Sequence, residues 1–193
     1  MDLPYGSIIG TSSVRRAGLI KNQRSDLKTV LFRGNINTRL QKLDNKEVDA
    51  TILAVAGLSR VGLVDRITQK FTLEEFPPAI GQGAIGIQCR LPKCEADEKI
   101  LNFISRVNHT YSAICVEAER AMLWALDGSC QTPIAGFTKL TEEGNITLKG
   151  FVISPDGAKI YSDSDTSSQA DAIKLGQEIG QRLLMKAGAD LIR

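Results

Sequence analysis

Serine, threonine, asparagine and arginine side chains gather in two short stretches near the start of the chain. The first covers residues 11–16 (TSSVRR) and the second covers residues 33–39 (RGNINTR). Each follows an apolar run typical of a strand and opens a run typical of a helix. A helix entrance offers free backbone N–H groups and the positive end of the helix dipole, and arginine adds planar forks that match carboxylates. Two such entrances predict a pocket for a ligand that carries several negative groups.

Positive charge is concentrated in the same part of the chain. The formal net charge is +2, yet residues 11–46 hold nine Lys or Arg against two acidic residues, so this segment carries +7 and the remainder −5. That imbalance predicts an anionic partner for the first part of the chain. Most of the basic residues also fit a solvated helix face. The candidates for binding are the arginines at the two entrances: Arg15, Arg16, Arg33 and Arg39.

Composition narrows the class of protein. The chain has 193 residues, of which 42% are hydrophobic and 24% charged, as in soluble globular proteins of one or two domains. It contains no apolar run of about 20 residues and no basic-then-apolar start, so we expect neither a membrane span nor a secretory leader. The cysteines lack close regular pairing, which predicts reduced thiols in the cytoplasm. The single His109 leaves no zinc constellation, so no metal site is expected.

Strand-like and helix-like runs alternate over the first part of the chain. We expect strands at 7–10, 29–32 and 49–56, and helices at 14–23, 36–43 and 58–63. This alternation predicts an α/β lobe with a mostly parallel sheet. Ligands of such sheets bind at the carboxyl ends of the strands, where both basic stretches lie. The third strand is apolar on both faces and is therefore expected in the middle of the sheet.

A break follows at Pro77-Pro78 and at residues 81–83, where we expect bending. Beyond it the pattern predicts a strand at 84–89, helices at 96–106 and 110–126, and strands at 132–140, 146–153 and 158–163. Turn residues separate the last three strands, and Ser167 or Ser168 caps a final helix that continues through Leu184. The second part is thus predicted to be a small α+β lobe with a three-stranded antiparallel sheet and helices.

Cys130 differs from the other cysteines because it falls between Gly128 and Pro133, on a tightly defined loop. A core thiol would normally occupy a regular apolar element, as Cys115 does in this pattern. His109 is the only histidine and is distant in sequence from Cys130, so the pattern does not favour a Cys-His hydrolase. An incidental surface thiol is the alternative reading.

Six ordered motifs resemble the porphobilinogen deaminase (hydroxymethylbilane synthase) family of haem biosynthesis. They are residues 10–16, 33–39, 52–58, 81–84, 119–121 and 128–131. The resemblance extends over essentially the whole chain but covers only the later part of the family's sequence, without a counterpart of its first domain. It implies a binding-protein-like second domain at 1–84, a crossing strand and helix at 85–107 that pack on the first domain, and a C-terminal domain at 108–193 with the cofactor cysteine.

The resemblance also implies residue roles. Cys130 would hold a dipyrromethane cofactor through a thioether, and Ser13, Arg15 and Arg16 would bind the cofactor's carboxylates. The remaining residues that would contact the cofactor or the substrate are Thr11, Ser12, Arg33, Arg39 and Gln82.

The implied reaction condenses four porphobilinogen molecules stepwise into hydroxymethylbilane, with ammonia released at each step. Its partners would be porphobilinogen and linear polypyrrole intermediates, and the full-length family member is expected to be monomeric. The family's catalytic aspartate belongs to the first domain, so no catalytic residue is assigned in this chain, and neither Asp49 nor Asp65 replaces it. We therefore expect the chain to be inactive alone, with an exposed apolar patch around Ile85, Ile87 and Leu101.

Two alternatives stay open. The chain could be a non-catalytic anion-binding module, for example for nucleic-acid phosphates, or a degenerate homologue that binds tetrapyrroles without making them. Phe32 is the only aromatic residue between Thr11 and Lys46, and no recognition-helix or zinc-finger pattern occurs, so nucleic acid is not the expected partner. Cys130 together with the four placed arginines argues against a degenerate homologue.

Overall fold

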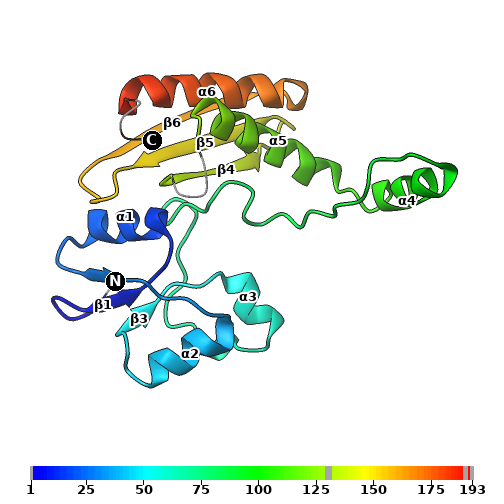
Figure 1. The fold of residues 1–193 in the computed structure, drawn as a ribbon. Helices are drawn as coiled ribbons and strands as arrows, with labels where there is room; N and C mark the ends of the chain where they lie inside the picture. Colours follow the sequence, from blue (N-terminus) through cyan, green and yellow to red (C-terminus); the bar gives the residue numbers. More distant parts are fainter. Residues whose placement is uncertain (1, 129–131, 189–190, 192–193) are drawn as a thin grey trace.

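The computed structural model describes residues 2–128, 132–188 and 191, which form two lobes and a projecting arm (Figure 1). Each lobe is built on its own three-stranded sheet. A connector, residues 76–83, runs between the lobes on its way to the arm, residues 85–107. The two-lobed α/β and α+β architecture predicted from the sequence is confirmed.

The first lobe contains the parallel sheet β2-β1-β3, made of β1 (Ile8–Gly10), β2 (Lys28–Val30) and β3 (Ala50–Thr51). The chain crosses between these strands through α1 (Val14–Gln23) and α2 (Ile36–Asp44), and α3 (Val55–Arg60) and the 3₁₀ turn η1 (Val64–Arg66) follow β3.

The prediction that the third strand lies in the middle of this sheet is wrong, because β1 is the central strand. The apolar run 49–56 is only partly strand: β3 ends at Thr51 and α3 already begins at Val55. Only the start of this run contacts the core of the first lobe, through Ala50 and Ile52, whereas residues 54–56 are exposed. The helix predicted at 58–63 spans Val55–Arg60 instead.

The second lobe contains the antiparallel sheet β4-β5-β6, made of β4 (Ile134–Leu140), β5 (Ile146–Ile153) and β6 (Ile160–Ser167). Two helices, α5 (Thr110–Ala125) and α6 (Ala172–Ala187), lie together over this sheet (Figure 1). β6 ends four residues beyond the predicted strand. The prediction that Ser167 or Ser168 caps the final helix is wrong: Ser168 precedes the 3₁₀ turn η2 (Gln169–Asp171), and Asp171 is the N-cap residue of α6. Fully buried core side chains join the layers: Met122, Leu148, Ile179 and Leu183.

Helix α1 belongs to the cores of both lobes. Its Ile20 packs with Ile9 and Leu27 in the first lobe. The neighbouring Leu19 packs with side chains of the second sheet, namely Ala135, Phe137, Phe151 and Ile153. The Asn22 amide also donates a 2.8 Å hydrogen bond to the carbonyl oxygen of Gly157, in the β5–β6 turn. Because one rigid helix is buried on both sides, the first turn of α1 is held relative to both sheets.

The connector is attached to the second lobe along its length. The Pro78 carbonyl oxygen accepts a 3.1 Å hydrogen bond from the backbone N–H of Gly136 in β4. The Ile80 side chain packs against the core of the second lobe, and Phe76 contacts the hydrophobic clusters on both sides of α1. The segment for which the sequence predicted bending is therefore packed on both lobes in this structure.

The arm projects away from both sheets (Figure 1). The strand predicted at 84–89 is wrong, because these residues lie beside no other strand of the described chain and form no ladder. Helix α4 (Glu95–Ser105) has no buried residue. The predicted apolar patch is confirmed as exposed: Ile85 is 79% exposed, Ile87 59% and Leu101 40%, and Phe103 on α4 adds a further 72% exposed side chain. None of the described helices has the length and apolar character needed to span a membrane.

We expect the double substitution Ile85→Gln with Phe103→Gln to lower the fluorescence of a hydrophobic-surface dye while the urea midpoint of unfolding stays unchanged. These side chains contribute no burial to either core, so their removal costs no transfer free energy. The matched control is Leu148→Ala, which empties a fully buried site and should cost about 2–5 kcal/mol of the unfolding free energy. A lowered midpoint in the double variant would contradict the exposed position of the arm.

Candidate functional site

The carboxyl ends of the three parallel strands are tied together at one edge of the first sheet. The Thr11 N–H donates a 3.0 Å hydrogen bond to the Val30 carbonyl oxygen, and the Ser12 hydroxyl donates one of 2.8 Å to the Phe32 carbonyl oxygen. These contacts join the loop after β1 to the loop after β2. The Arg16 guanidinium reaches the third strand end with a 2.7 Å hydrogen bond to the Ile52 carbonyl oxygen.

The entrance of α1 lies at this edge. Ser13 is the N-cap, and its hydroxyl oxygen accepts a 3.3 Å hydrogen bond from the Arg16 N–H, while the Thr11 hydroxyl oxygen accepts one of 3.2 Å from the Ser13 N–H. The first helical amides, those of Val14 and Arg15, have no intrahelical acceptor. Together with the helix dipole they give the edge a positive potential even before side-chain charges are counted.

The entrance of α2 is built in a similar way. Asn35 is the N-cap, and its side-chain oxygen accepts hydrogen bonds of 2.9 Å from the Thr38 N–H and 3.0 Å from the Thr38 hydroxyl. Arg39 donates through Nε to the Gly34 carbonyl oxygen at 2.8 Å, which folds its side chain back over the entrance. Arg33 is exposed and its guanidinium has no protein partner within the described part of the chain.

Burial and mutual repulsion weaken the protonation of two of these arginines. Arg15 is only 5% exposed, and desolvation, with the Arg16 charge beside it, lowers its pKa to about 10. Desolvation also lowers the pKa of Arg16, with a smaller contribution from Arg39. Among the described residues no carboxylate forms an ion pair with Arg15, Arg16, Arg33 or Arg39. The edge thus carries clustered positive charge that an anion would relieve.

Arg15 and Gln82 turn toward the connector and not toward the open edge. The Arg15 guanidinium donates a short hydrogen bond to the Pro77 carbonyl oxygen and a 3.4 Å hydrogen bond to the side-chain oxygen of Gln82. Thr11, Ser12, Ser13, Arg16 and Arg39 lie at the strand ends, as described above. Cys130 lies outside the described residues, so its distance to these groups is not defined.

Sequence reasoning missed Glu119 on α5. Its side chain is only 8% exposed, and its two oxygens accept hydrogen bonds from the Gly81 N–H at 2.8 Å and the Thr138 N–H at 2.9 Å. Desolvation raises the pKa of this carboxyl, although both hydrogen bonds oppose the shift. The sequence offers only a weak signal, since Cys115, Ala118 and Met122 at helical spacing are apolar while Glu119 itself has the charge of a surface residue.

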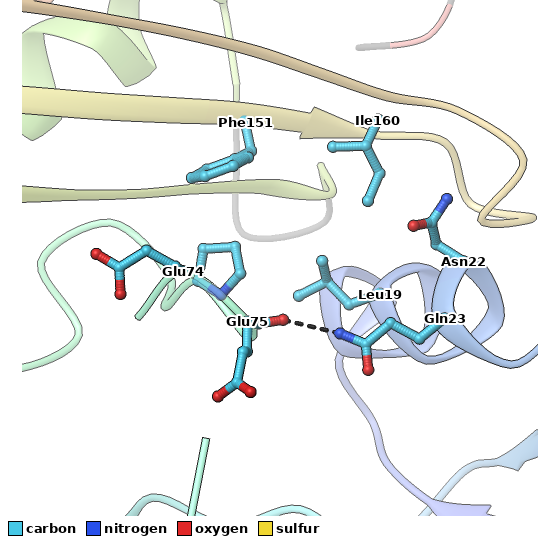
Figure 2. A pocket seen from close by; sticks show the side chains of 8 residues that line it. Leu19, Asn22, Gln23, Glu74, Glu75, Phe151 and Ile160 are labelled. Carbon is cyan, nitrogen blue, oxygen red and sulfur yellow. Dashed lines mark hydrogen bonds between the residues drawn. The ribbon is translucent and has the colours of Figure 1, made fainter. Parts of the chain in front are cut away.

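A cavity of about 240 Å³ lies between the lobes, but it is not this edge (Figure 2). Its walls come from α1, from the connector and the two residues before it, and from the second sheet: Leu19, Asn22, Gln23, Glu74, Glu75, Pro77, Phe151 and Ile160. The Gln23 amide closes one side with a 2.8 Å hydrogen bond to the Glu75 carbonyl oxygen. Gln23 is the last residue of α1, about 13 Å along the helix from its first residue, Val14. The described residues contain no cluster of His, Cys, Asp and Glu suited to a metal ion.

Family models match most of the chain. Residues 1–100 match the model described as "Porphobilinogen deaminase, dipyromethane cofactor binding domain", and residues 113–185 match "Porphobilinogen deaminase, C-terminal domain". The porphobilinogen deaminase of Nitrobacter hamburgensis is 43% identical over 187 residues, which cover 97% of this chain and 58% of that protein. The chloroplastic porphobilinogen deaminases of Pisum sativum and Oryza sativa are 42% and 40% identical, again over 97% of this chain and over 50% and 52% of their own lengths. The chain thus spans about half the length of these curated relatives.

We expect the unfolding free energy of the wild type, relative to Glu119→Gln, to fall as pH rises above the ordinary carboxyl pKa of 4.5. The folded-state pKa of Glu119 is raised, so between the two pKa values the folded state binds more protons than the unfolded state, and raising pH disfavours folding. Urea titrations of both proteins between pH 4 and pH 8 measure this difference. The exposed Glu117→Gln on the same helix is the control and should show no such trend. A relative stability of the wild type that rises with pH would contradict the assignment.

Proposed function

This chain belongs to the porphobilinogen deaminase family, and we propose that its basic edge binds the carboxylates of the pyrrole chain in the synthesis of hydroxymethylbilane. In the proposed reaction four porphobilinogen molecules condense stepwise with loss of ammonia, on a covalently attached dipyrromethane. Each pyrrole of that chain carries an acetate and a propionate, so its binding requires many donors for carboxylate oxygens. The observation that carries the proposal is the convergence of three strand ends and several arginines that form no ion pair with any carboxylate of the described residues.

The donor chemistry of the edge fits the cofactor. Burial lowers the pKa of Arg16 and the nearby charge of Arg39 lowers it further, and a bound carboxylate would oppose both effects. Arg33 offers a full guanidinium fork. The first amides of α1 add donors that no protein group of the helix satisfies. The dipyrromethane, when bound, supplies the primer on which the pyrrole chain is extended.

We assign different tasks to the residues of the edge. Arg16, Arg33 and Arg39, with the Ser13 cap, are proposed to contact carboxylates directly. The side chains of Thr11 and Ser12 already bind protein groups and are proposed to shape the loops. Arg15 and Gln82 bind each other and the connector, which supports a positioning role for them. The catalytic acid that moves protons in this reaction is not assigned to any residue of this chain.

Cys130 is proposed to hold the cofactor through a thioether, which resists hydrolysis. Support comes from its flanks, since the segment around it is attached at both ends. The Gly128 N–H donates a 3.0 Å hydrogen bond to the Leu123 carbonyl oxygen at the end of α5, and β4 begins at Ile134. Only five residues, 129–133, separate these two positions in the sequence, so a group bound to Cys130 would stay within reach of the second lobe.

The exposed apolar arm suggests how the chain is divided into segments. We propose that residues 1–84, 85–107 and 108–193 form successive structural segments, and that the apolar side of the arm packs on a further domain of longer family members. An isolated helix of this length is marginal in water, and the exposed apolar side chains of α4 and of residues 85–91 support such packing.

A cytoplasmic location is also proposed, in keeping with the free thiols of Cys89, Cys94 and Cys115.

Replacing a proposed direct ligand should weaken porphobilinogen binding. We expect Arg16→Gln and Arg39→Gln each to raise the Kd for porphobilinogen about tenfold, since each removes a charge-assisted contact worth about 1.5–3 kcal/mol. Calorimetric titration at fixed ionic strength measures this change. The control is Arg60→Gln, an exposed arginine on α3, which should leave the Kd unchanged. Equal affinity in all four proteins would contradict the proposed edge, and equally tight binding of a nucleic acid would favour the general anion-binding alternative.

The attachment site is tested by mass. Protein produced in cells that make porphobilinogen should carry an adduct equal to two condensed pyrroles on the peptide that contains Cys130. Cys130→Ser should lose this adduct, and Cys94→Ser, which removes an exposed thiol on the arm, should keep it. Persistence of the adduct in Cys130→Ser would place the attachment elsewhere.

A further inference from the structure

The structure contains a buried carboxylate that the proposed site does not use. Glu119 stands on a helix face that is otherwise apolar, and its burial is tolerated because both oxygens accept backbone N–H groups. One of these donors, Thr138, lies in β4, so this contact stays inside the second lobe. The other donor, Gly81, lies on the connector. Glu119 therefore ties the connector to the second lobe through one defined atom.

The same turn of the connector is held from the first lobe by a second buried charge. Arg15 donates to the Pro77 carbonyl oxygen and to the side-chain oxygen of Gln82. That Gln82 oxygen also accepts a 3.0 Å hydrogen bond from the Ala79 N–H, which fixes its orientation. Gly81 and Gln82 are adjacent, so the Glu119 carboxylate of the second lobe and the Arg15 guanidinium of the first lobe form hydrogen bonds with neighbouring residues of the connector.

The backbone of this turn is closed by hydrogen bonds, so the positions of Gly81 and Gln82 depend on each other. Gly81 has a φ of +65°, a left-handed conformation that glycine adopts without strain. Hydrogen bonds of 3.1 Å from the Gln82 N–H to the Ala79 carbonyl oxygen and 3.0 Å from the Ala84 N–H to the Gly81 carbonyl oxygen close the turn. A shift of the Gly81 N–H therefore also shifts the side chain of Gln82.

We propose that Glu119 is a positioning residue for the carboxylate-binding edge, acting through Gly81, Gln82 and Arg15 on the first turn of α1. When the Glu119 contact is lost, Gln82 moves and the buried guanidinium of Arg15 loses an acceptor that water cannot replace. The first turn of α1, which carries Ser13 and Arg16, then loses one of the contacts that define its position, while the packing of α1 and the Arg15 bond to Pro77 remain. The effect on ligand affinity rests on the proposed function, whereas the effect on the connector does not.

Glu119→Gln tests the proposal, because the amide keeps the volume but has one acceptor oxygen for two N–H donors. Hydrogen exchange should become about tenfold faster at the Gly81 and Ala79 amides, while the amide of Leu148 in β5 keeps its protection. The Kd for porphobilinogen should rise about fivefold under the same conditions. Glu117→Gln, two residues away and exposed, should change neither quantity.

Gln82→Met is the second variant and leaves Glu119 in place. It should weaken porphobilinogen binding to the same extent, because it removes one acceptor of the Arg15 guanidinium. The Gly81 amide should stay protected, because its hydrogen bond to Glu119 remains. In the double variant Glu119→Gln with Gln82→Met, the two losses of porphobilinogen affinity should not add, because both substitutions interrupt the same chain of contacts.

Three results would overturn the proposal. One is exchange that accelerates equally at Leu148, which indicates a general loss of stability. Another is unchanged exchange at Gly81 and Ala79 in Glu119→Gln. The last is strict additivity of the two substitutions in porphobilinogen affinity. If the wild-type chain does not bind porphobilinogen, the proposed function fails, and the exchange pattern alone decides whether Glu119 holds the connector.

Discussion

The burial of the Arg15 guanidinium is the constraint on which the arrangement of the two lobes depends. A cation removed from water needs acceptors in fixed places, and leaving a buried donor without an acceptor costs about 1–3 kcal/mol, and more for a charged group. Arg15 finds them on the connector, at Pro77 and Gln82, and therefore α1 and the connector have to stay in register. Since α1 is also packed between both sheets through Leu19 and Ile20, this single helix relates the basic edge of the first sheet to the second lobe.

The chemistry of the edge follows from where that helix begins. Its cap at Ser13 places unpaired amides and Arg16 beside the loop from β2, and hydrogen bonds from Thr11 and Ser12 hold the two loops together. Charges of one sign are thereby gathered where water is partly excluded, and a polyanion bound there would relieve their repulsion. A chain of pyrroles bearing acetates and propionates is a ligand of that kind.

Much of this protein could be predicted from its sequence because the signals are local. Hydrophobic periodicity and capping residues located α1, α2, α5 and the three strands of the second sheet, and the order of motifs identified the family. The errors arose where local patterns are ambiguous. An apolar run at 49–56 reads equally as a central strand or as an edge strand followed by a helix, and the run at 84–89 reads as a strand although no neighbouring backbone pairs with it.

The sequence by itself determined the family, the two lobe types and which side chains could bind carboxylates, since these depend on residue type and short spacing. Only the tertiary structure decided how those side chains divide their work. Arg15 and Arg16 are adjacent and chemically identical, yet one faces the connector and the other the strand ends, because successive residues of a helix point about 100° apart. Glu119 reads as a surface acid until α5 is packed, and its partners Gly81 and Thr138 are 38 and 19 residues away. Such long-range pairings depend on how whole elements pack, which no local pattern encodes.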